Sequence, residues 1–202
     1  MSEIAEIEVK FLVEDEQTLR RKLTALEAIP HGRAFETNIC YEDDQKQFQA
    51  AGSLLRLRKD RRSWLTFKYA PDEMSRNFKI LNELEVQVSD FETMDQVLRR
   101  MGYHHERVYE KWRETFDLGD AMLCLDNMPY GTFLEIEGSR EAIRELARRL
   151  RFDWRRRILI NYLAIFEHLK RTAGLTFNDV TFDNFKTIVV SFNKLIRACE
   201  AG

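Results

Sequence analysis

The stretch IAEIEVKFLV, residues 4–13, carries the pattern that decides the fold. Charged side chains at Glu6, Glu8 and Lys10 alternate with apolar side chains between them. A period of two is typical of a β-strand, because successive side chains point to opposite faces of a sheet. This strand would therefore have one charged face and one apolar face.

Similar alternation recurs along the first 150 residues. Further strands are predicted at Asn38–Tyr41, Leu54–Lys59, Ser63–Tyr69, Leu81–Val88, Val108–Phe116, Ala121–Asp126 and Thr132–Glu137. Amphipathic helices are predicted at Asp15–Leu26, from a cap at Ser89 to Arg100, and from a cap at Ser139 to Leu150. Pro71–Arg76 is predicted to be a polar loop. The mixture of antiparallel strands and outlying helices indicates the α+β class.

The charged strand faces have an unusual composition. On any single strand a polar face is most often simply solvated, but such a face normally mixes Ser, Thr, Gln and Lys. Here the faces carry acidic pairs and basic pairs at alternate positions: Glu6/Glu8, Glu83/Glu85, Glu135/Glu137, Arg56/Arg58 and Lys111/Arg113, joined by Lys10 and Lys68. The opposite faces are apolar and need helices to cover them. We therefore expect a closed eight-stranded antiparallel β-barrel, with a polar charged tunnel inside and helices packed outside.

The chain changes character after residue 150. Residues 151–202 hold nine basic and five acidic residues, whereas the first 150 are net acidic. Two helices are predicted there, Arg155–Thr172 and Phe182–Ala198. We expect a tunnel domain over residues 1–150 and a C-terminal helical extension, residues 151–202, packed on the same domain. An apolar stripe that includes Ile158, Tyr162 and Ile165 would be core or the contact of a homodimer.

Composition excludes several classes of protein. Lys+Arg number 32 and Asp+Glu number 34 among 202 residues, so the net charge of −2 makes nucleic acid an improbable partner. No run of about 18 apolar residues occurs, which argues against a membrane protein. The three cysteines are widely spaced, and the acidic N-terminus is unlike a signal peptide, so a cytoplasmic location is expected.

The charges in the expected tunnel suggest its ligand. Carboxylate oxygens are the ligands that Mg²⁺ and Mn²⁺ prefer, and paired carboxylates on neighbouring strands could hold such ions. Clustered Arg and Lys side chains suit phosphate oxygens, Arg through its forked geometry. A divalent metal together with a polyphosphate is the simplest ligand that uses both sets.

These segments, in this order, resemble the CYTH superfamily, the triphosphate tunnel metalloenzymes. The Glu6-Ile7-Glu8-Val9-Lys10 strand is similar to the ExExK strand that opens that family. The following blocks match in order from residue 3 to about 150: Asn38-Ile39-Cys40-Tyr41, Ser53–Arg58, Leu65-Thr66-Phe67-Lys68, Glu83-Leu84-Glu85, Lys111-Trp112-Arg113, Leu125-Asp126 and Gly131–Glu137. The short ExExK pattern alone is weak, whereas the ordered set is specific.

The resemblance implies roles for individual residues. The metal ligands would be Glu6, Glu8, Glu135 and Glu137, with Mg²⁺ or Mn²⁺ as cofactor. The triphosphate would lie on Lys10, Arg56, Arg58, Lys68, Lys111 and Arg113. Glu83, Glu85 and Asp126 match acidic positions that bind metal or orient this cradle, and the catalytic candidates are Lys10, Lys68 and Asp126.

The chain also departs from the family pattern. Asn82 stands where relatives often place an Arg before the acids of the fifth strand, and only Lys79 or Arg76 could substitute for it. Tyr69-Ala70-Pro71 replaces a common Gly-Pro after the fourth-strand lysine. These differences bear on the substrate more than on metal and phosphate binding.

The family resemblance leaves three functions open. The favoured one is a class IV-type adenylyl cyclase, which converts ATP to cyclic AMP and pyrophosphate. The alternative is a triphosphatase that hydrolyses inorganic triphosphate, thiamine triphosphate or a nucleoside triphosphate. A third possibility is a non-catalytic triphosphate-binding module. No residue of the sequence separates the first two, because both require the same phosphate chemistry.

Overall fold

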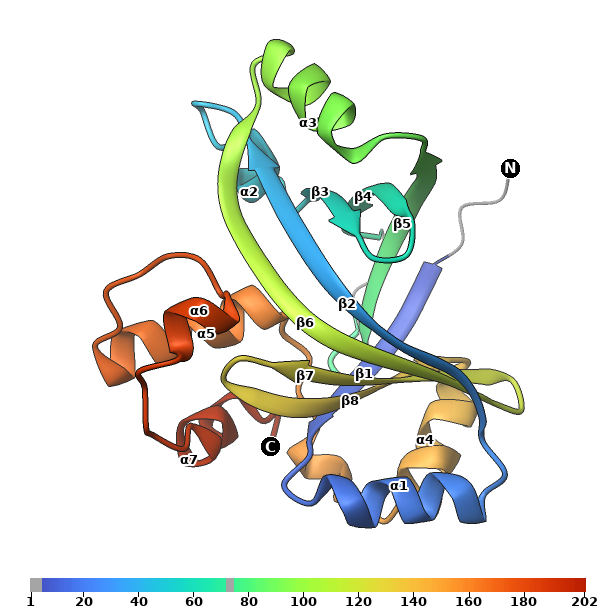
Figure 1. The fold of residues 1–202 in the computed structure, drawn as a ribbon. Coiled ribbons are helices and arrows are strands. Elements are labelled where there is room, and N and C mark those ends of the chain that lie inside the picture. Colours follow the sequence, from blue (N-terminus) through green and yellow to red (C-terminus); the bar gives the residue numbers. More distant parts are fainter. Residues whose placement is uncertain (1–4, 72–74) are drawn as a thin grey trace.

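The computed structural model describes residues 5–71 and 75–202, so Ile4 and part of the predicted loop, residues 72–74, lie outside it. Its centre is a closed antiparallel barrel in the order β1-β5-β4-β3-β2-β6-β7-β8, which confirms the predicted fold (Figure 1). The strands are β1 (Ala5–Leu12), β2 (Ile29–Glu42), β3 (Leu54–Lys59), β4 (Ser63–Tyr69), β5 (Lys79–Val88), β6 (His104–Leu118), β7 (Ala121–Met128) and β8 (Gly131–Gly138).

Strand β1 closes the barrel because it pairs on both sides. Its Glu8 lies opposite Lys79 of β5 and opposite Glu137 of β8. Residues that pair directly across an antiparallel ladder share a face of the sheet. The register therefore places charged side chains from three neighbouring strands on the inner face of the barrel.

Strand β2 is much longer than the predicted Asn38–Tyr41. Its first half, Ile29–Phe35, is largely exposed and pairs with the far end of β6. Gly32 lies there with φ of +91°, next to a break in the register after Pro30. Alternation requires one buried face, so it is absent from this exposed half, and the prediction began only where the inner side chains become buried.

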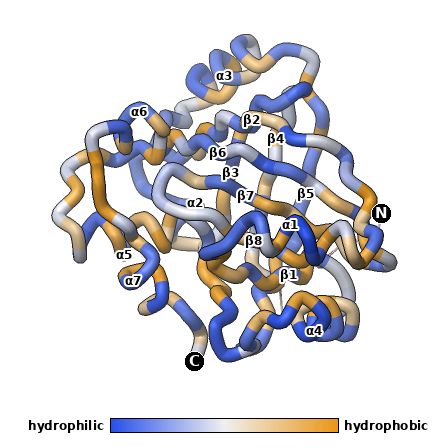
Figure 2. The backbone as a smooth tube through the Cα atoms, turned by 60° about the horizontal axis from the view of Figure 1, so that its bottom comes forward, coloured by the Kyte–Doolittle hydropathy of each residue, from blue (hydrophilic) through white to orange (hydrophobic). Residues whose placement is uncertain are grey.

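Helices cover the apolar outer face of the barrel. Helices α1 (Glu16–Ala25) and α4 (Arg140–Arg149) bury their apolar sides in one cluster with β1, β7 and β8. Helix α3 (Phe91–Arg100) covers residues of β2, β3 and β5 in another cluster. In Figure 2 hydrophobic and hydrophilic segments mix along these elements, as expected where each has one buried side.

Two helix details differ from the predictions. The cap of α3 is Asp90, whose carboxylate accepts from the Thr93 amide at 2.7 Å, and not Ser89. The carboxylate takes this role because Asp is as good a cap as Ser and lies one residue nearer the helix. A short helix, α2 (Gln47–Ala50), follows β2 and was not predicted.

The C-terminal helices were predicted too long. Residues 154–156 form a short 3₁₀ turn, and Ile158 then makes an isolated bridge with Lys10 of β1, so α5 begins only at Tyr162 and runs to Ala173. The second predicted helix is broken into α6 (Phe182–Phe185), α7 (Asn193–Ile196) and a 3₁₀ turn at Arg197–Cys199. The β-branched run from Thr187 to Val190 disfavours helix between them.

The C-terminal segment is tied to the barrel at two levels. Val180 exchanges backbone hydrogen bonds with Val108 and Glu110 of β6. Ile165 and Phe166 of α5 are fully buried in a third cluster with side chains of β7 and β8. The apolar stripe of this segment is therefore core. Among the described residues no helix is both long and apolar enough to cross a membrane.

We propose that residues 151–202 unfold together with the barrel in one transition. Phe166→Ala should lower the free energy of unfolding by about 3–5 kcal/mol, because it leaves a cavity between α5 and the strands. Val189→Ala is the control, since Val189 is 96% exposed and should change little. Urea unfolding followed by circular dichroism measures both. A separate early transition for the C-terminal segment would contradict the proposal.

Candidate functional site

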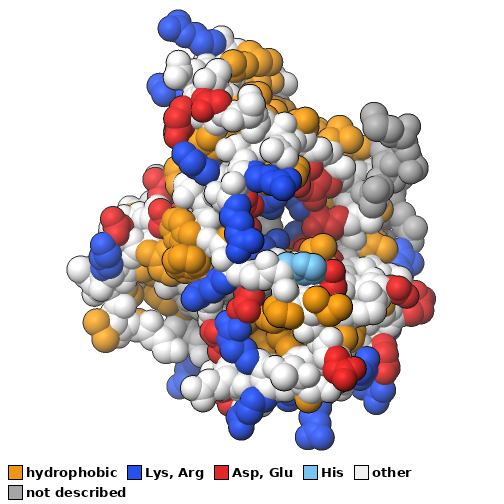
Figure 3. All heavy atoms as spheres, turned by 45° about the vertical axis from the view of Figure 1, so that its right-hand side comes forward, with side chains coloured by type: hydrophobic (Ala, Val, Ile, Leu, Met, Phe, Trp, Pro, Cys, Tyr) orange, Lys and Arg blue, Asp and Glu red, His pale blue; other side chains and the backbone are white. Residues whose placement is uncertain are grey.

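The inner faces of the strands surround a cavity of about 1410 Å³. All twelve predicted metal, phosphate-binding and additional acidic residues other than Asp126 line it: Glu6, Glu8, Lys10, Arg56, Arg58, Lys68, Glu83, Glu85, Lys111, Arg113, Glu135 and Glu137. Figure 3 shows the opening of the tunnel, with Lys and Arg side chains on one side and Asp and Glu side chains on the other. The charged residues are thus gathered in one space with the two signs partly separated.

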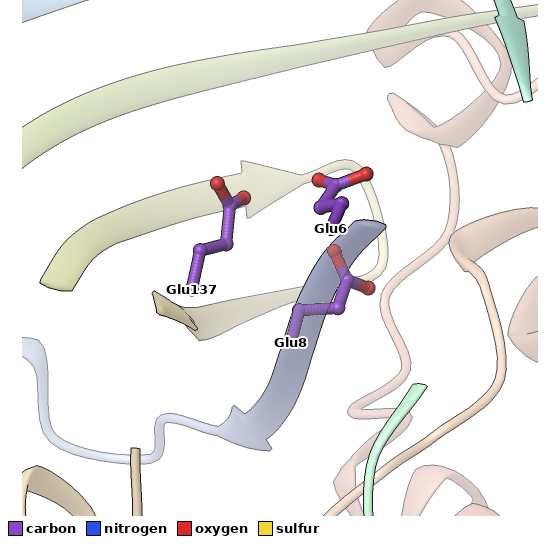
Figure 4. A group of neighbouring side chains, drawn as sticks. All are labelled: Glu6, Glu8 and Glu137. Atoms are coloured by element: carbon purple, nitrogen blue, oxygen red, sulfur yellow. The ribbon is translucent and has the colours of Figure 1, made fainter. Parts of the chain in front are cut away.

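Three of the four predicted metal ligands form one acidic cluster. Glu6 and Glu8 of β1 and Glu137 of β8 each offer a carboxylate oxygen, and these oxygens lie within 4.8 Å of one another (Figure 4). Glu135 is not in this group. Its carboxylate instead lies 3.2 Å from the Lys10 ammonium and 2.5 Å from the Arg113 guanidinium. Three converging carboxylates suit a hard divalent cation, which takes oxygen ligands.

The acidic cluster is incompletely ionised at neutral pH. Burial raises the pKa of Glu137 to about 8, and the carboxylates of Glu135, Glu6 and Glu8 add to this shift while Arg113 opposes it. Burial also raises the pKa of Glu6 to about 6, although the Lys68 ammonium opposes it. Like charges that are close together in a buried site cannot all ionise without a counter-charge. The donor set therefore fits Mg²⁺ or Mn²⁺, whose charge would stabilise the ionised carboxylates.

Glu8 differs because it has cationic partners. Burial and Glu135 raise its pKa, but the ammonium groups of Lys79, Lys10 and Lys68 together outweigh them and lower the pKa to about 2. The Lys79 and Lys10 Nζ atoms lie 2.7 and 3.3 Å from Glu8 Oε1. Of the two residues considered as substitutes for the missing arginine, Lys79 lies in the cavity and pairs with the acidic cluster.

The basic side chains of β3 and β4 are held by acids of β5. Arg58 Nη2 lies 3.4 Å from Glu85, and the Lys68 ammonium lies 2.7 Å from Glu83 and also contacts Glu6. These pairs are partly exposed to the cavity, so a stronger anion can compete for the cations. Arg58 and Lys68 form a basic wall of the cavity. The additional acids Glu83 and Glu85 therefore keep this basic wall paired in the absence of ligand.

Asp126 holds the basic pair of β6. It is fully buried, and its carboxylate accepts from Lys111 Nζ at 3.0 Å, from Arg113 Nε at 2.7 Å and from the Tyr162 hydroxyl at 2.8 Å. With its oxygens occupied in this way, Asp126 fixes the direction in which Lys111 and Arg113 point. The geometry makes it a positioning residue for these two cations.

Two residues of the site were missed by sequence reasoning. Glu36 of β2 lies 3.5 Å from Lys111, and although burial raises its pKa, Lys111 and Arg113 lower it to about 2. Glu36 lies two residues before Asn38, so it shares the inner face of β2. A predicted strand that began before Asn38 would have placed Glu36 inside the barrel. Tyr162 of α5 was assigned only to the apolar stripe, yet its ring lies 4.9 Å from the Lys10 ammonium. No strand pattern could have revealed a side chain supplied by a helix.

The chain is similar in sequence and in fold to known proteins. The family model of the CYTH domain matches residues 5–159. Similar proteins include three that are described as putative adenylate or adenylyl cyclases. One from Methanocaldococcus jannaschii is 26% identical over 142 residues, 69% of this chain and 80% of that protein.

The other two similar proteins have solved structures. The structure from Vibrio parahaemolyticus has a TM-score of 0.73 at 18% identity and covers 82% of this chain and 99% of that chain. The structure from Hippeastrum, reported to reveal a dominant triphosphatase activity, has a TM-score of 0.59 at 17% identity and covers 80% of this chain and 95% of that chain. At these identities the two structures support the fold.

The raised pKa of Glu137 predicts a dependence of stability on pH. Its pKa is about 8 in the folded protein against an ordinary value of 4.5, so the folded state binds the extra proton between these values. The free energy of unfolding should therefore fall as pH rises from about 4.5 to 8. Glu137→Gln should reduce this slope and melt at a higher temperature than the wild type at pH 8.5.

The same variant tests the acidic cluster as a cation site. Mg²⁺ should raise the wild-type melting temperature more at pH 8.5 than at pH 6, because ligand carboxylates must be ionised. Glu137→Gln should lose most of this increase, whereas Glu141→Gln, an exposed acid on α4, should keep it. Equal responses of both variants to Mg²⁺ would show that the cluster is not the site.

Proposed function

Because the chain belongs to the CYTH domain family, we propose that it is a divalent-metal-dependent enzyme that converts ATP to cyclic AMP and pyrophosphate in the barrel tunnel. One observation carries the proposal: a single cavity holds an acidic cluster, a basic wall and, beyond them, a partly apolar region. The first two match the metal and the triphosphate chain. The third offers room for a nucleoside.

The partly apolar region lies where the C-terminal segment meets the barrel. Its apolar lining includes Leu54, Ile160, Leu163 and Ala164, and Tyr109 and the ion pair between Arg107 and Glu167 also line the cavity. Apolar lining with a few polar groups is typical of sites for organic ligands. Inorganic triphosphate would leave this part of the cavity empty, which favours a substrate that carries an organic group.

The basic residues would bind and orient the triphosphate. Phosphate oxygens would compete with Glu85 for Arg58 and with Glu83 for Lys68, and each exchange replaces a partly exposed carboxylate with a more highly charged partner. Lys111 and Arg113 need no such release, because Asp126 already directs them. The cradle would then neutralise the charge that develops on the departing pyrophosphate.

The acidic cluster would hold the metal. Mg²⁺ or Mn²⁺ bound by Glu6, Glu8 and Glu137 would supply Lewis-acid polarisation of phosphate oxygens and activation of the attacking hydroxyl. Lys10 lies between this cluster and the cradle, paired with Glu8 and Glu135 and donating to the Ile160 carbonyl at 3.1 Å. This position would keep its ammonium aimed at the phosphates without a change of rotamer.

Triphosphate hydrolysis is the second candidate function. The Hippeastrum protein, which shares this fold, is described as having a dominant triphosphatase activity. In that reaction the same cradle would hold the chain while water attacks the terminal phosphorus. The two reactions differ only in the attacking group, the ribose hydroxyl or water.

A single set of incubations distinguishes them. ATP, inorganic triphosphate and thiamine triphosphate are each incubated with the protein and Mg²⁺ or Mn²⁺, and the products are separated by chromatography. We expect cyclic AMP and pyrophosphate in equal amounts from ATP. ADP and phosphate without cyclic AMP would establish the triphosphatase instead. No product from any substrate would leave a binding module.

Arg58→Lys tests the basic wall. Lysine keeps the charge but loses the forked pair of donors, so kcat/KM for ATP should fall at least about tenfold. Arg62→Lys is the matched control, because Arg62 is exposed in the turn between β3 and β4. Steady-state kinetics measure both variants. Unchanged kcat/KM for Arg58→Lys would remove this residue from the cradle.

A further inference from the structure

The wall formed by β2 and β3 holds several buried polar atoms without hydrogen bonds. Five of the seven such side-chain atoms among residues 5–71 and 75–202 lie there: Oε2 of Glu36, both amide atoms of Asn38, and Nε of Arg56 and of Arg58. A buried polar group without a partner costs about 1–3 kcal/mol. Their concentration on one wall of the tunnel calls for a physical explanation.

Asn38 lies at the centre of this group. Its side chain is fully buried, and neither its oxygen nor its nitrogen has a hydrogen-bond partner in the described chain. Across the sheet it stands directly opposite Arg58, and Arg56 lies on the diagonal, opposite Cys40. Glu36, two residues earlier, shares its face of the strand. Asn38 is therefore within reach of each of the other three side chains.

These atoms without hydrogen bonds are complementary. Two of them lie only in long ion pairs, because Arg58 Nε is 3.5 Å from the Asp60 carboxylate and Glu36 Oε2 is 3.5 Å from the Lys111 ammonium. The two Arg Nε–H groups and the Asn38 amide nitrogen are donors, whereas the Asn38 oxygen and Glu36 Oε2 are acceptors. They do not bond to one another because the outer nitrogens of the two guanidinium groups donate to other residues. Arg56 donates to the Tyr109 hydroxyl at 3.1 Å and to Thr66 at 3.4 Å, and Arg58 donates to Glu85 at 3.4 Å.

We propose that Asn38 is a positioning residue for the arginine cradle, and that it acts when triphosphate occupies the tunnel. Phosphate oxygens take the outer nitrogens of Arg56 and Arg58 from Thr66, Tyr109 and Glu85. The guanidinium planes turn, and their Nε–H groups donate to the Asn38 oxygen while the Asn38 nitrogen donates to Glu36. This inference rests on the proposed function, since it requires a triphosphate in the tunnel.

This arrangement links ligand binding to stability. In the empty protein the unpaired amide destabilises the fold, and the bonds it forms on binding recover that free energy. An asparagine with a purely structural role would already have its partners, and its loss would weaken both folding and binding. Loss of the Asn38 amide should instead raise the stability of the empty protein and lower its affinity for triphosphate.

Asn38→Leu separates these cases. It removes the unpaired amide and keeps the branching and the number of side-chain heavy atoms, so the empty variant should melt at a higher temperature than the wild type. Its affinity for inorganic triphosphate with Mg²⁺, measured by calorimetry, should fall about tenfold because the cradle loses its acceptor. Thr37→Val is the matched control on the opposite face of β2 and should bind as the wild type does.

A spectroscopic measurement reports on the arginines directly. In ¹H–¹⁵N spectra of the arginine side chains, triphosphate with Mg²⁺ should slow the solvent exchange of the Arg56 and Arg58 Nε–H protons in the wild type but not in Asn38→Leu. Arg113 serves as the internal reference, because its Nε already donates to Asp126 at 2.7 Å. Its exchange should be the same in both proteins.

A second variant covers the case in which Asn38→Leu does not fold. Asn38→Asp keeps the shape and offers a charged acceptor, so both Nε–H protons should exchange slowly without any ligand, and triphosphate should bind more weakly. Unchanged triphosphate affinity or unchanged arginine exchange in the folded variants would overturn the inference alone. A wild type that binds no triphosphate would overturn the proposed function, and this inference with it.

Discussion

The constraint on which this structure depends is that ionised side chains inside a closed barrel must neutralise one another. Glu8, Lys10, Lys111 and Asp126 are each at most 4% exposed. Burying such groups without partners would cost several kcal/mol for each ion. Opposite charges therefore have to come from neighbouring strands, and the closed order of strands supplies them. The apolar faces must then point outward, which requires the surrounding helices.

Neutralisation inside the tunnel is incomplete at two places, and these are the places where ligands would bind. At the acidic cluster, Glu137 has its pKa raised to about 8, so it remains largely protonated at neutral pH. On the β2–β3 wall, buried donors and acceptors lack hydrogen bonds. Both defects raise the free energy of the empty protein. A cation at the first and an anion at the second would remove them, so under the proposed function ligand binding would relieve this instability.

The sequence predicted the parts of the fold in which local pattern and tertiary structure agree. The alternation around Glu6, Glu8 and Lys10 predicted a barrel with its charged faces inside, and the three helices predicted in the first 150 residues were placed to within a few residues. The exposed half of β2 was missed because it has no buried face. The helices after residue 154 were predicted too long because Ile158 extends to pair with Lys10 and a β-branched run interrupts the last helix. Glu36 and Tyr162 enter the site through contacts between distant segments, which no local pattern encodes.

Under the proposed function, the choice of attacking group would depend on the partly apolar region of the tunnel. The cradle and the acidic cluster come from the strands and would orient any triphosphate in the same way. The region beyond them is lined by Ile160 to Ala164, and the match to the family model ends at residue 159. Tyr162 links the two regions, because its hydroxyl donates to Asp126 and its ring lies against Lys10. If the proposed function holds, a change in the segment after residue 159 would alter which hydroxyl approaches the phosphates while leaving the barrel unchanged, so one barrel could serve either cyclisation or hydrolysis.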